Sequence, residues 1–168
     1  RFAERDASVA CISTYTWPSF DSEPRLYPYL SPRFSGWGAY LPLSFVKLYE
    51  EINLQSLKDL MSDREKADRL AVCGKELEVF FELQASKRLD AGDVLANFAL
   101  LKHGLNCLIP PKSLLHNDGH DGSGVHCVRT NRFLNKYHLN SEEVSMMSFD
   151  TSDSGIRQAQ NLKFFNSF

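Results

Sequence analysis

Two short, dense runs of apolar and β-branched residues constrain the fold of this chain most strongly. The first is Ala7 to Tyr15, "ASVACISTY", and the second begins "LNCLIPP", where two prolines end it. Such runs are typical of buried strands when turn residues bound them, because a helix of the same burial needs a longer segment. We therefore expect a strand near the start of the chain and another after residue 104.

Three segments between these runs carry apolar residues at helical intervals. One amphipathic helix is expected from about Pro42, and a second from Asp63, where "SDREKADR" carries a Ser-Asp cap signal. A third covers "AGDVLANFALLKHG" and ends at Gly104, a C-cap position. The expected buried positions are Phe45, Leu48, Tyr49 and Ile52 in the first helix, Leu70, Cys73, Leu77, Phe80 and Phe81 in the second, and Val94, Leu95, Phe98 and Leu101 in the third.

Composition and charge exclude several classes of protein. With 168 residues, 43% of them hydrophobic and 24% charged, the chain has ordinary globular composition. Its formal charge of −2 offers no basic face for nucleic acid, and no apolar run approaches the roughly eighteen residues of a membrane span. The four cysteines are scattered without a CxxC pair, which favours free thiols in a reducing compartment. We expect a cytoplasmic protein, or one peripheral at the inner membrane.

The segment "HNDGHDGSGVHC", residues 116–127, concentrates histidine, aspartate and glycine. Its side chains can ligate a divalent metal, and its backbone N–H groups can face phosphate oxygens. The metal candidates are Asp118, His120, Asp121 and His126, and the phosphate-facing candidates are Gly122, Ser123 and Gly124. The spacing matches no zinc-protease or P-loop pattern, and a Gly-rich surface turn has the same composition, so both interpretations stay open.

The segment "SPRFSGWGAY", residues 31–40, is a second candidate. Gly36 and Gly38 flank Trp37 and let the backbone bend sharply, which can present the indole for stacking on a sugar or a base. The alternative is a Trp that fills a gap between this loop and the next helix.

Asp90 and Asp93 stand at the entrance of the third expected helix, in "RLDAGDVLANF". An aspartate at this place can cap the helix through its carboxylate. It can also act as a general base where a cleft lies at the helix N-terminus.

Read in order, these segments resemble the C-terminal half of bacterial sugar transferases related to the family 2 glycosyltransferases, the group described as hemolytic-protein-like or capsular-sugar transferases. The matching stretches are "ACISTYTWP", "YLSPRFSGWGAYLPLSF" and "PPKSLLHNDGHDGSGVHC". The last is the specific one, since residues 110–127 follow the family's "PxxSLVxNIGHDGSGTHC" pattern nearly residue for residue. The order of the weaker matches agrees over residues 7–127.

The resemblance implies an α/β fold: a partial GT-A, or Rossmann-like α/β/α sandwich, of which this chain is the acceptor half with several helices and few short strands. Residues 1–127 would form the acceptor part of the catalytic domain. Residues 128–168 would be an extension packing on it or on a partner chain. No DxD-like metal motif of the nucleotide-binding half stands before the first strand, so the start at Arg1 looks internal. An incomplete sandwich exposes apolar surface or an open edge strand, which predicts self-association.

The activity implied by the resemblance is transfer of a sugar from a nucleotide-sugar donor to a glycan or glycoconjugate acceptor in bacterial surface polysaccharide synthesis. A divalent metal, Mn or Mg, would assist. The residues implied are Asp93 or Asp90 as catalytic base, Trp37 and Gly38 at the sugar wall, Gly122, Ser123 and Gly124 near the donor diphosphate, and His120, Asp121 and His126 near the metal. Because "LDAGDVLANF" lacks the tryptophans that the family often has there, Asp90 and Asp93 remain equal rivals.

Two other classes of function stay open. A non-catalytic module could bind a carbohydrate or a protein through the aromatic loop, residues 17–37. A metal-dependent hydrolase using His120 and His126 would need a third ligand, which the spacing does not place.

Overall fold

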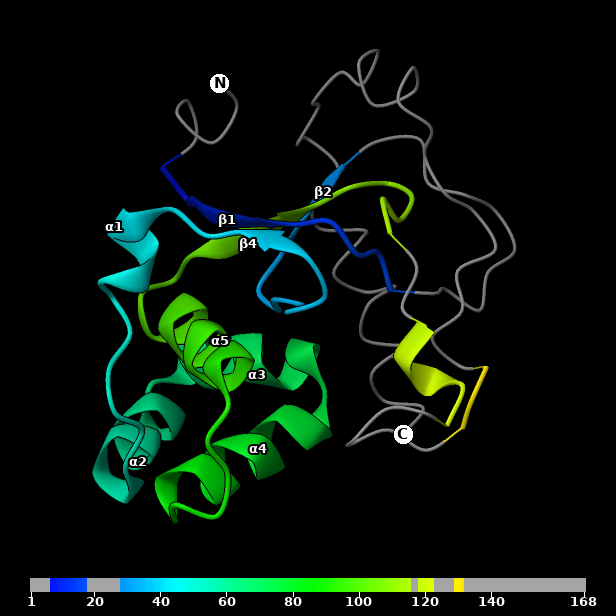
Figure 1. Ribbon diagram of the computed structural model, residues 1–168. Coiled ribbons are helices and arrows are strands. Elements are labelled where there is room, and N and C mark those ends of the chain that lie inside the picture. The colour runs from blue at the N-terminus through cyan, green and yellow to red at the C-terminus, as the bar shows by residue number, and fades with distance from the viewer. Residues whose placement is uncertain (1–6, 18–27, 116–117, 123–128, 132–168) are drawn as a thin grey trace.

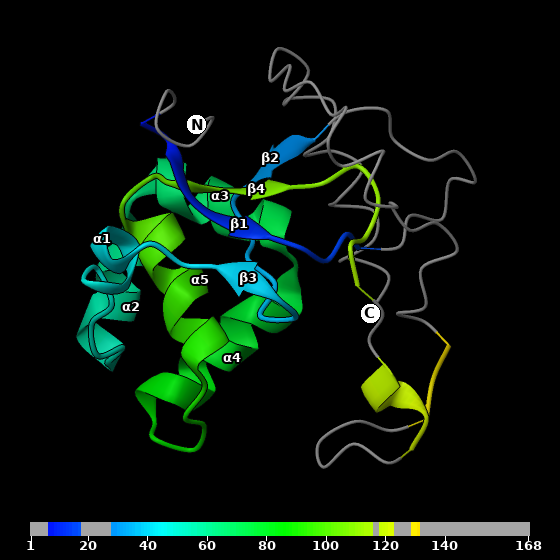
Figure 2. The same cartoon turned by 45° about the horizontal axis from the view of Figure 1, so that its top comes forward.

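The computed structural model describes residues 7–17, 28–115, 118–122 and 129–131 and contains one four-stranded mixed sheet (Figure 1). Its strands are β1 Val9–Ser13, β2 Tyr29–Ser31, β3 Ala39–Tyr40 and β4 Asn106–Ile109, in the order β2-β4-β1-β3. β1 and β4 pair in parallel at the centre, while β2 and β3 are antiparallel edge strands, as Figure 2 shows. The two strands predicted from sequence are therefore the central pair.

Five α-helices and one 3₁₀ turn complete the described part. They are α1 Leu43–Val46, α2 Leu54–Ser62, α3 Arg64–Cys73, α4 Lys75–Ala85, α5 Gly92–Lys102 and η1 Asp118–His120. Helices α2 to α5 lie together on one side of the sheet (Figure 1). The chain is thus a mixed α/β protein, as predicted. No helix in the described segments is long and apolar enough to cross a membrane.

The single helix predicted from Pro42 is wrong, because α1 ends at Val46 and α2 begins only at Leu54. Asn53 starts α2 with a reciprocal cap. Its side-chain oxygen accepts hydrogen bonds from the Ser56 N–H (2.9 Å) and the Gln55 N–H, and the Ser56 hydroxyl accepts one from the Asn53 N–H at 3.0 Å. This capping box fixes a new helix start inside a segment whose apolar spacing runs on without a break.

The helix predicted from Asp63 is divided into two. Asp63 caps α3 as expected, accepting from the Glu65 and Lys66 N–H groups. Gly74 then takes φ +96°, a conformation that other residues adopt at a cost, and the chain restarts as α4. This change of direction turns Phe80 outward to 39% exposure, so its predicted burial is wrong, whereas Leu77 and Phe81 are buried.

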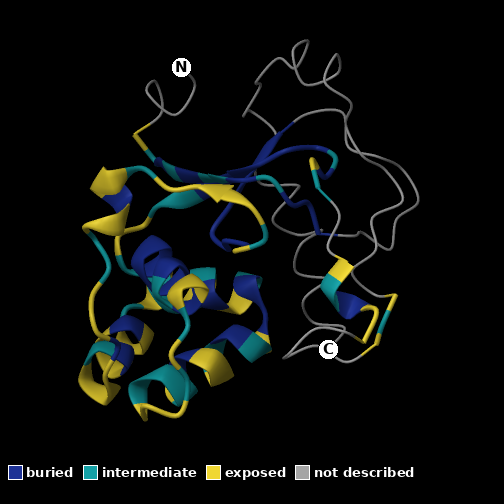
Figure 3. Cartoon of the chain, viewed as in Figure 1, coloured by how far each residue is buried: buried dark blue, intermediate teal, exposed yellow. Residues whose placement is uncertain are grey.

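Helix α5 confirms its prediction and is the central helix of the fold (Figure 3). Gly104 ends it at φ +65°, with the Gly104 N–H donating to the Leu101 carbonyl and the Leu105 N–H to the Leu100 carbonyl. One side of α5 packs against the sheet and the other against α3 and α4. The sheet-side cluster includes Ala96, Ala99, Leu100, Cys11, Cys107 and Ile109, and the helix-side cluster includes Val94, Phe98, Leu101, Leu77 and Phe81.

The cysteines that the structure describes are buried free thiols, as predicted: Cys11, Cys73 and Cys107. Burial raises the pKa of the Cys73 thiol to about 12. Cys127 lies outside the described residues, as do nearly all of residues 128–168, so the predicted division of the chain at residue 127 stays a prediction.

Candidate functional site

The loop after β2 carries Trp37 and is fastened to the first turns of α5 by a buried amide. The Asn97 side-chain oxygen accepts a hydrogen bond from the Phe34 N–H at 2.8 Å, and its nitrogen donates to the Phe34 and Asp93 carbonyl oxygens. Asn97 was not among the predicted site residues. The available signal was a polar residue on the most apolar face of α5, because a buried amide is retained where it satisfies backbone groups.

Arg33 fastens the same loop from the side of α3 and α4. It is 8% exposed and donates hydrogen bonds to the Cys73 carbonyl oxygen and, at 2.6 Å, to a carboxylate oxygen of Glu76. Its guanidinium also lies over the Trp17 ring, 5.2 Å from the centroid. The loop is therefore held at fixed points on both sides, which gives Trp37 a defined position.

Gly38 closes the loop onto the end of β1 through its backbone. Its carbonyl oxygen accepts hydrogen bonds from the N–H (2.9 Å) and the hydroxyl (2.8 Å) of Thr14. Gly38 has φ +69°, and a Cβ there would collide with the side chains of Leu115 and Thr14. Gly38, predicted at a sugar-facing wall, is thus required by the close backbone approach.

Trp37 lies in a cluster of aromatic rings. Its ring centroid is 4.7 Å from Tyr15, 5.7 Å from Trp17 and 5.3 Å from His120, and the ring planes of Trp37 and His120 meet at 65°. Tyr15 and Trp17 are buried, whereas Trp37 is half-buried. The indole therefore packs on one part of its surface and presents another to solvent, which combines the two interpretations that the sequence left open.

Asp93 lies beside the turn that carries Trp37. A Cβ built on Gly36 would stand 3.2 Å from the Asp93 Cβ, so the absence of a side chain at residue 36 allows this approach. Asp93 is exposed, and its carboxylate accepts a hydrogen bond from the Val94 N–H at 3.0 Å. It does not occupy the N-cap position of α5, which is Ala91 and has no side-chain cap.

Asp90, the rival base, is also exposed and also not the cap, but it lines a different feature. It borders a cavity next to α4 whose lining does not include Asp93. Asp90 and Asp93, which are equivalent candidates by sequence, therefore lie at different features of the structure.

His120 and its neighbours bring part of the Gly-rich segment to the same place. His120 is 8% exposed, at the end of η1, and its carbonyl oxygen accepts a hydrogen bond from the Thr130 N–H at 3.0 Å. Asp121 and Gly122 are exposed, and Gly122 has φ +98°. The other predicted residues of this segment, Ser123, Gly124 and His126, lie outside the described residues.

Metal ligands do not gather in the described part of the chain. There, no three His, Cys, Asp or Glu side chains are placed to hold a metal ion. The candidate site is accordingly defined by Trp37, Asp93 and His120. Chemically it offers an exposed carboxylate that can accept a proton, next to the turn whose indole can support the apolar face of a sugar ring.

Comparisons with known proteins identify no relative of this chain. No protein-family model matches the sequence, and no curated protein or solved structure is significantly similar to the chain. The functional interpretation therefore depends on the motifs and on the geometry of the candidate site.

Proposed function

We propose that this chain is the acceptor side of a glycosyltransferase that moves a sugar from a nucleotide-sugar donor to a glycan or glycoconjugate in bacterial surface polysaccharide synthesis. The observation that carries the proposal is the meeting of three distant segments. The turn of Gly36 lies against Asp93, and the ring of Trp37 lies against His120. Two of these segments, those of Trp37 and His120, belong to the stretches on which the resemblance depends, and packing alone does not require an exposed carboxylate on the third.

In the proposed reaction Asp93 is the general base. Its carboxylate takes the proton of the acceptor hydroxyl while that oxygen bonds to the anomeric carbon of the donor. The bond from this carbon to the nucleoside diphosphate breaks, and the diphosphate leaves with the electron pair. A positioned base typically contributes about 10²–10⁴ in rate. Trp37 supports the face of the sugar ring. The Asn97 side-chain amide positions Asp93 by donating a hydrogen bond to the main-chain carbonyl oxygen of Asp93.

The described residues do not by themselves form a binding site for the metal that the resemblance implies. Asp121 offers an exposed carboxylate of the kind that Mg²⁺ or Mn²⁺ accepts, but the His120 ring is buried against Trp37. These two side chains do not form a metal site by themselves, so we assign no step of the reaction to a metal. A divalent metal remains part of the proposal for the complete enzyme.

Calorimetric titration with UDP and GDP in the presence of Mn²⁺ tests the proposal. It compares this chain with a version extended at its N-terminus. Binding by the extended version alone is the expected result, because the proposal assigns the nucleotide to a half that this chain lacks. Absence of binding to either version would contradict the proposal.

A non-catalytic carbohydrate- or protein-binding module is the second candidate. The half-buried Trp37 favours it, because an indole packed against Tyr15 and Trp17 with part of its surface exposed is itself a stacking surface. This candidate requires neither the nucleotide nor Asp93. It predicts that Trp37→Ala abolishes carbohydrate or protein binding while Asp93→Asn leaves it intact.

A further inference from the structure

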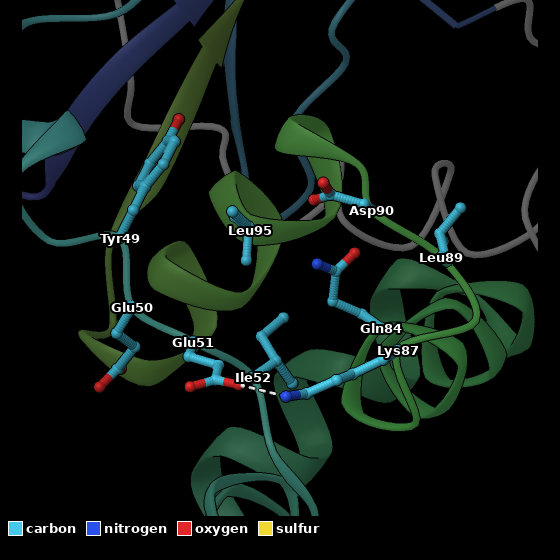
Figure 4. A pocket seen from close by; sticks show the side chains of 9 residues that line it. All are labelled: Tyr49, Glu50, Glu51, Ile52, Gln84, Lys87, Leu89, Asp90 and Leu95. Carbon is cyan, nitrogen blue, oxygen red and sulfur yellow. Dashed lines mark ion pairs between the residues drawn. The ribbon is translucent and has the colours of Figure 1, made fainter.

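A cavity of about 490 Å³ lies between the α4–α5 connection and the residues that precede α2 (Figure 4). We call it the α4–α5 cavity. Neither Trp37, Asp93 nor His120 lines it, so it is separate from the candidate site. Its volume falls in the range of small-molecule sites, which is roughly 300–1,000 Å³.

The inner wall of the α4–α5 cavity is apolar. Ile52 is 2% exposed, and Leu95 is half-buried on α5. Both side chains lie at the centre of the group drawn in Figure 4, with Tyr49 on one side. A ligand here would meet aliphatic carbon over part of its surface.

The charges around the cavity largely neutralise one another. Glu51 pairs with Lys87 at 3.7 Å across the opening, and Glu50 pairs with Lys102 at 2.5 Å. Asp90 is the one lining carboxylate with no cation beside it in the described part of the chain. A cationic ligand could pair only with Asp90, because Lys87 and Lys102 already pair with the other two carboxylates. An anion such as a phosphate would meet three carboxylates and one lining ammonium, so an uncharged ligand fits best.

Two features fix the main chain of the polar rim, from which the Lys87 side chain extends at 83% exposure. The Gln84 side-chain oxygen accepts a hydrogen bond from the Ala91 N–H at 3.1 Å, which leaves the amide nitrogen free to donate. Lys87 has φ +59° where the chain leaves α4. Its N–H donates to the Gln84 carbonyl, and the Arg88 N–H donates to the Leu83 carbonyl.

The corresponding turn at the end of α5 has Gly104 at this position, and glycine is the residue type that adopts positive φ without strain. A lysine in the corresponding place at the end of α4 costs stability. Non-glycine residues held at positive φ are concentrated at functional sites, which supports a role for Lys87 at this rim.

We propose that the α4–α5 cavity binds an uncharged saccharide of one or two rings. Hydroxyl groups both donate and accept hydrogen bonds, so they can donate to the Asp90 carboxylate and accept from the Lys87 ammonium and the Gln84 amide. The C–H face of the ring would then pack on Ile52 and Leu95. This inference does not depend on the transfer reaction proposed for Asp93.

Amide-resolved NMR titration of the whole 168-residue chain tests the inference. The probes are glucose, galactose, mannose, N-acetylglucosamine, lactose and maltose, with glucose 6-phosphate as the charged comparison. We expect at least one uncharged probe to shift the amides of Ile52, Lys87 and Leu95, and glucose 6-phosphate to bind more weakly. The inference is overturned if no uncharged probe shifts these amides, or if glucose 6-phosphate binds more tightly.

A matched pair of variants locates the binding. Asp90→Ala should weaken it by at least about tenfold, the loss expected for one hydrogen bond to a charged acceptor. Asp68→Ala removes an exposed carboxylate on α3 and should leave the affinity unchanged. Equal affinities in the two variants would remove Asp90 from the site. Asp93→Asn should bind the saccharide as the natural chain does, and loss of binding in this variant would contradict a separate site.

Discussion

The ring of Trp37 meets the ring of His120 edge-on, with 5.3 Å between the two centroids. Trp37 comes from the loop after β2, and His120 comes from η1, far along the chain. Edge-to-face pairs of this kind add about 0.5–1.5 kcal/mol to the burial of the rings. The contact joins the turn that faces Asp93 to the segment rich in histidine, aspartate and glycine.

Gly38→Ala tests whether the backbone of this loop is as constrained as the structure indicates. The new methyl group would collide with Leu115 and Thr14 at φ +69°, so we expect a loss of about 2 kcal/mol or more in the free energy of unfolding. Gly92→Ala is the matched control. Gly92 lies in the first turn of α5, and a Cβ added there would meet no atom within 4 Å beyond its chain neighbours and its own helix backbone. This variant should therefore be equal to the natural chain or up to about 1 kcal/mol more stable. Urea unfolding measures both, and equal stabilities would contradict this description.

Self-association remains a prediction, and an exposed apolar segment now gives it a location. Tyr40 ends the edge strand β3, and Leu41 and Leu43 follow it toward and into α1. All three side chains are exposed, with Leu43 at 69%. If copies of the chain meet at this edge, Leu43→Glu should shift the population toward monomer in light scattering. Leu54→Glu changes a leucine that is 61% exposed on α2 and should leave the assembly unchanged. A natural chain that is monomeric at all concentrations would show that this prediction is wrong.

Because the Cys73 thiol is buried, we expect the free energy of unfolding to fall in alkaline solution. Burial raises the pKa of this thiol to about 12, from an ordinary value of 9.0. Between these two values the unfolded chain releases the proton and the folded chain retains it, so the free energy of unfolding falls as pH rises. Cys73→Ala should be less stable at neutral pH, because it loses packing in the core, yet should lose less stability between pH about 8 and about 11. Urea unfolding at the two pH values measures the difference, and parallel losses in both proteins would exclude Cys73 as the cause.

The elements that could be predicted from sequence are those whose signals are local. The dense run around β1, the two prolines after β4 and the glycine that ends α5 each act within a few residues. The two helix breaks were missed because the apolar spacing continues through them. The residues that signal the breaks are the capping pair Asn53 and Ser56 and the glycine at position 74. Each of these residue types also occurs inside helices, so the sequence alone did not show that a helix ends there.

The candidate site could be predicted only in part. The residue types were evident, since Trp37, Asp93 and His120 stand in distinctive segments. Which aspartate faces the Trp37 turn depends on Gly36 and Asn97, which act across the fold and leave no local pattern. Arg33 was missed for the same reason, because its partners Cys73 and Glu76 are distant in sequence.

The central claim, that Asp93 is the base of a sugar transferase, is tested most directly by donor turnover. The measurement is release of nucleoside diphosphate from UDP-glucose, UDP-galactose, UDP-N-acetylglucosamine and GDP-mannose by the N-terminally extended version, with water as acceptor. For any donor that is turned over, we predict that Asp93→Asn lowers the rate by about 10²–10⁴ without weakening UDP or GDP binding, while Asp68→Asn leaves the rate unchanged. An undiminished rate in Asp93→Asn, or a fall of that size in Asp90→Asn instead, would contradict the assignment of Asp93.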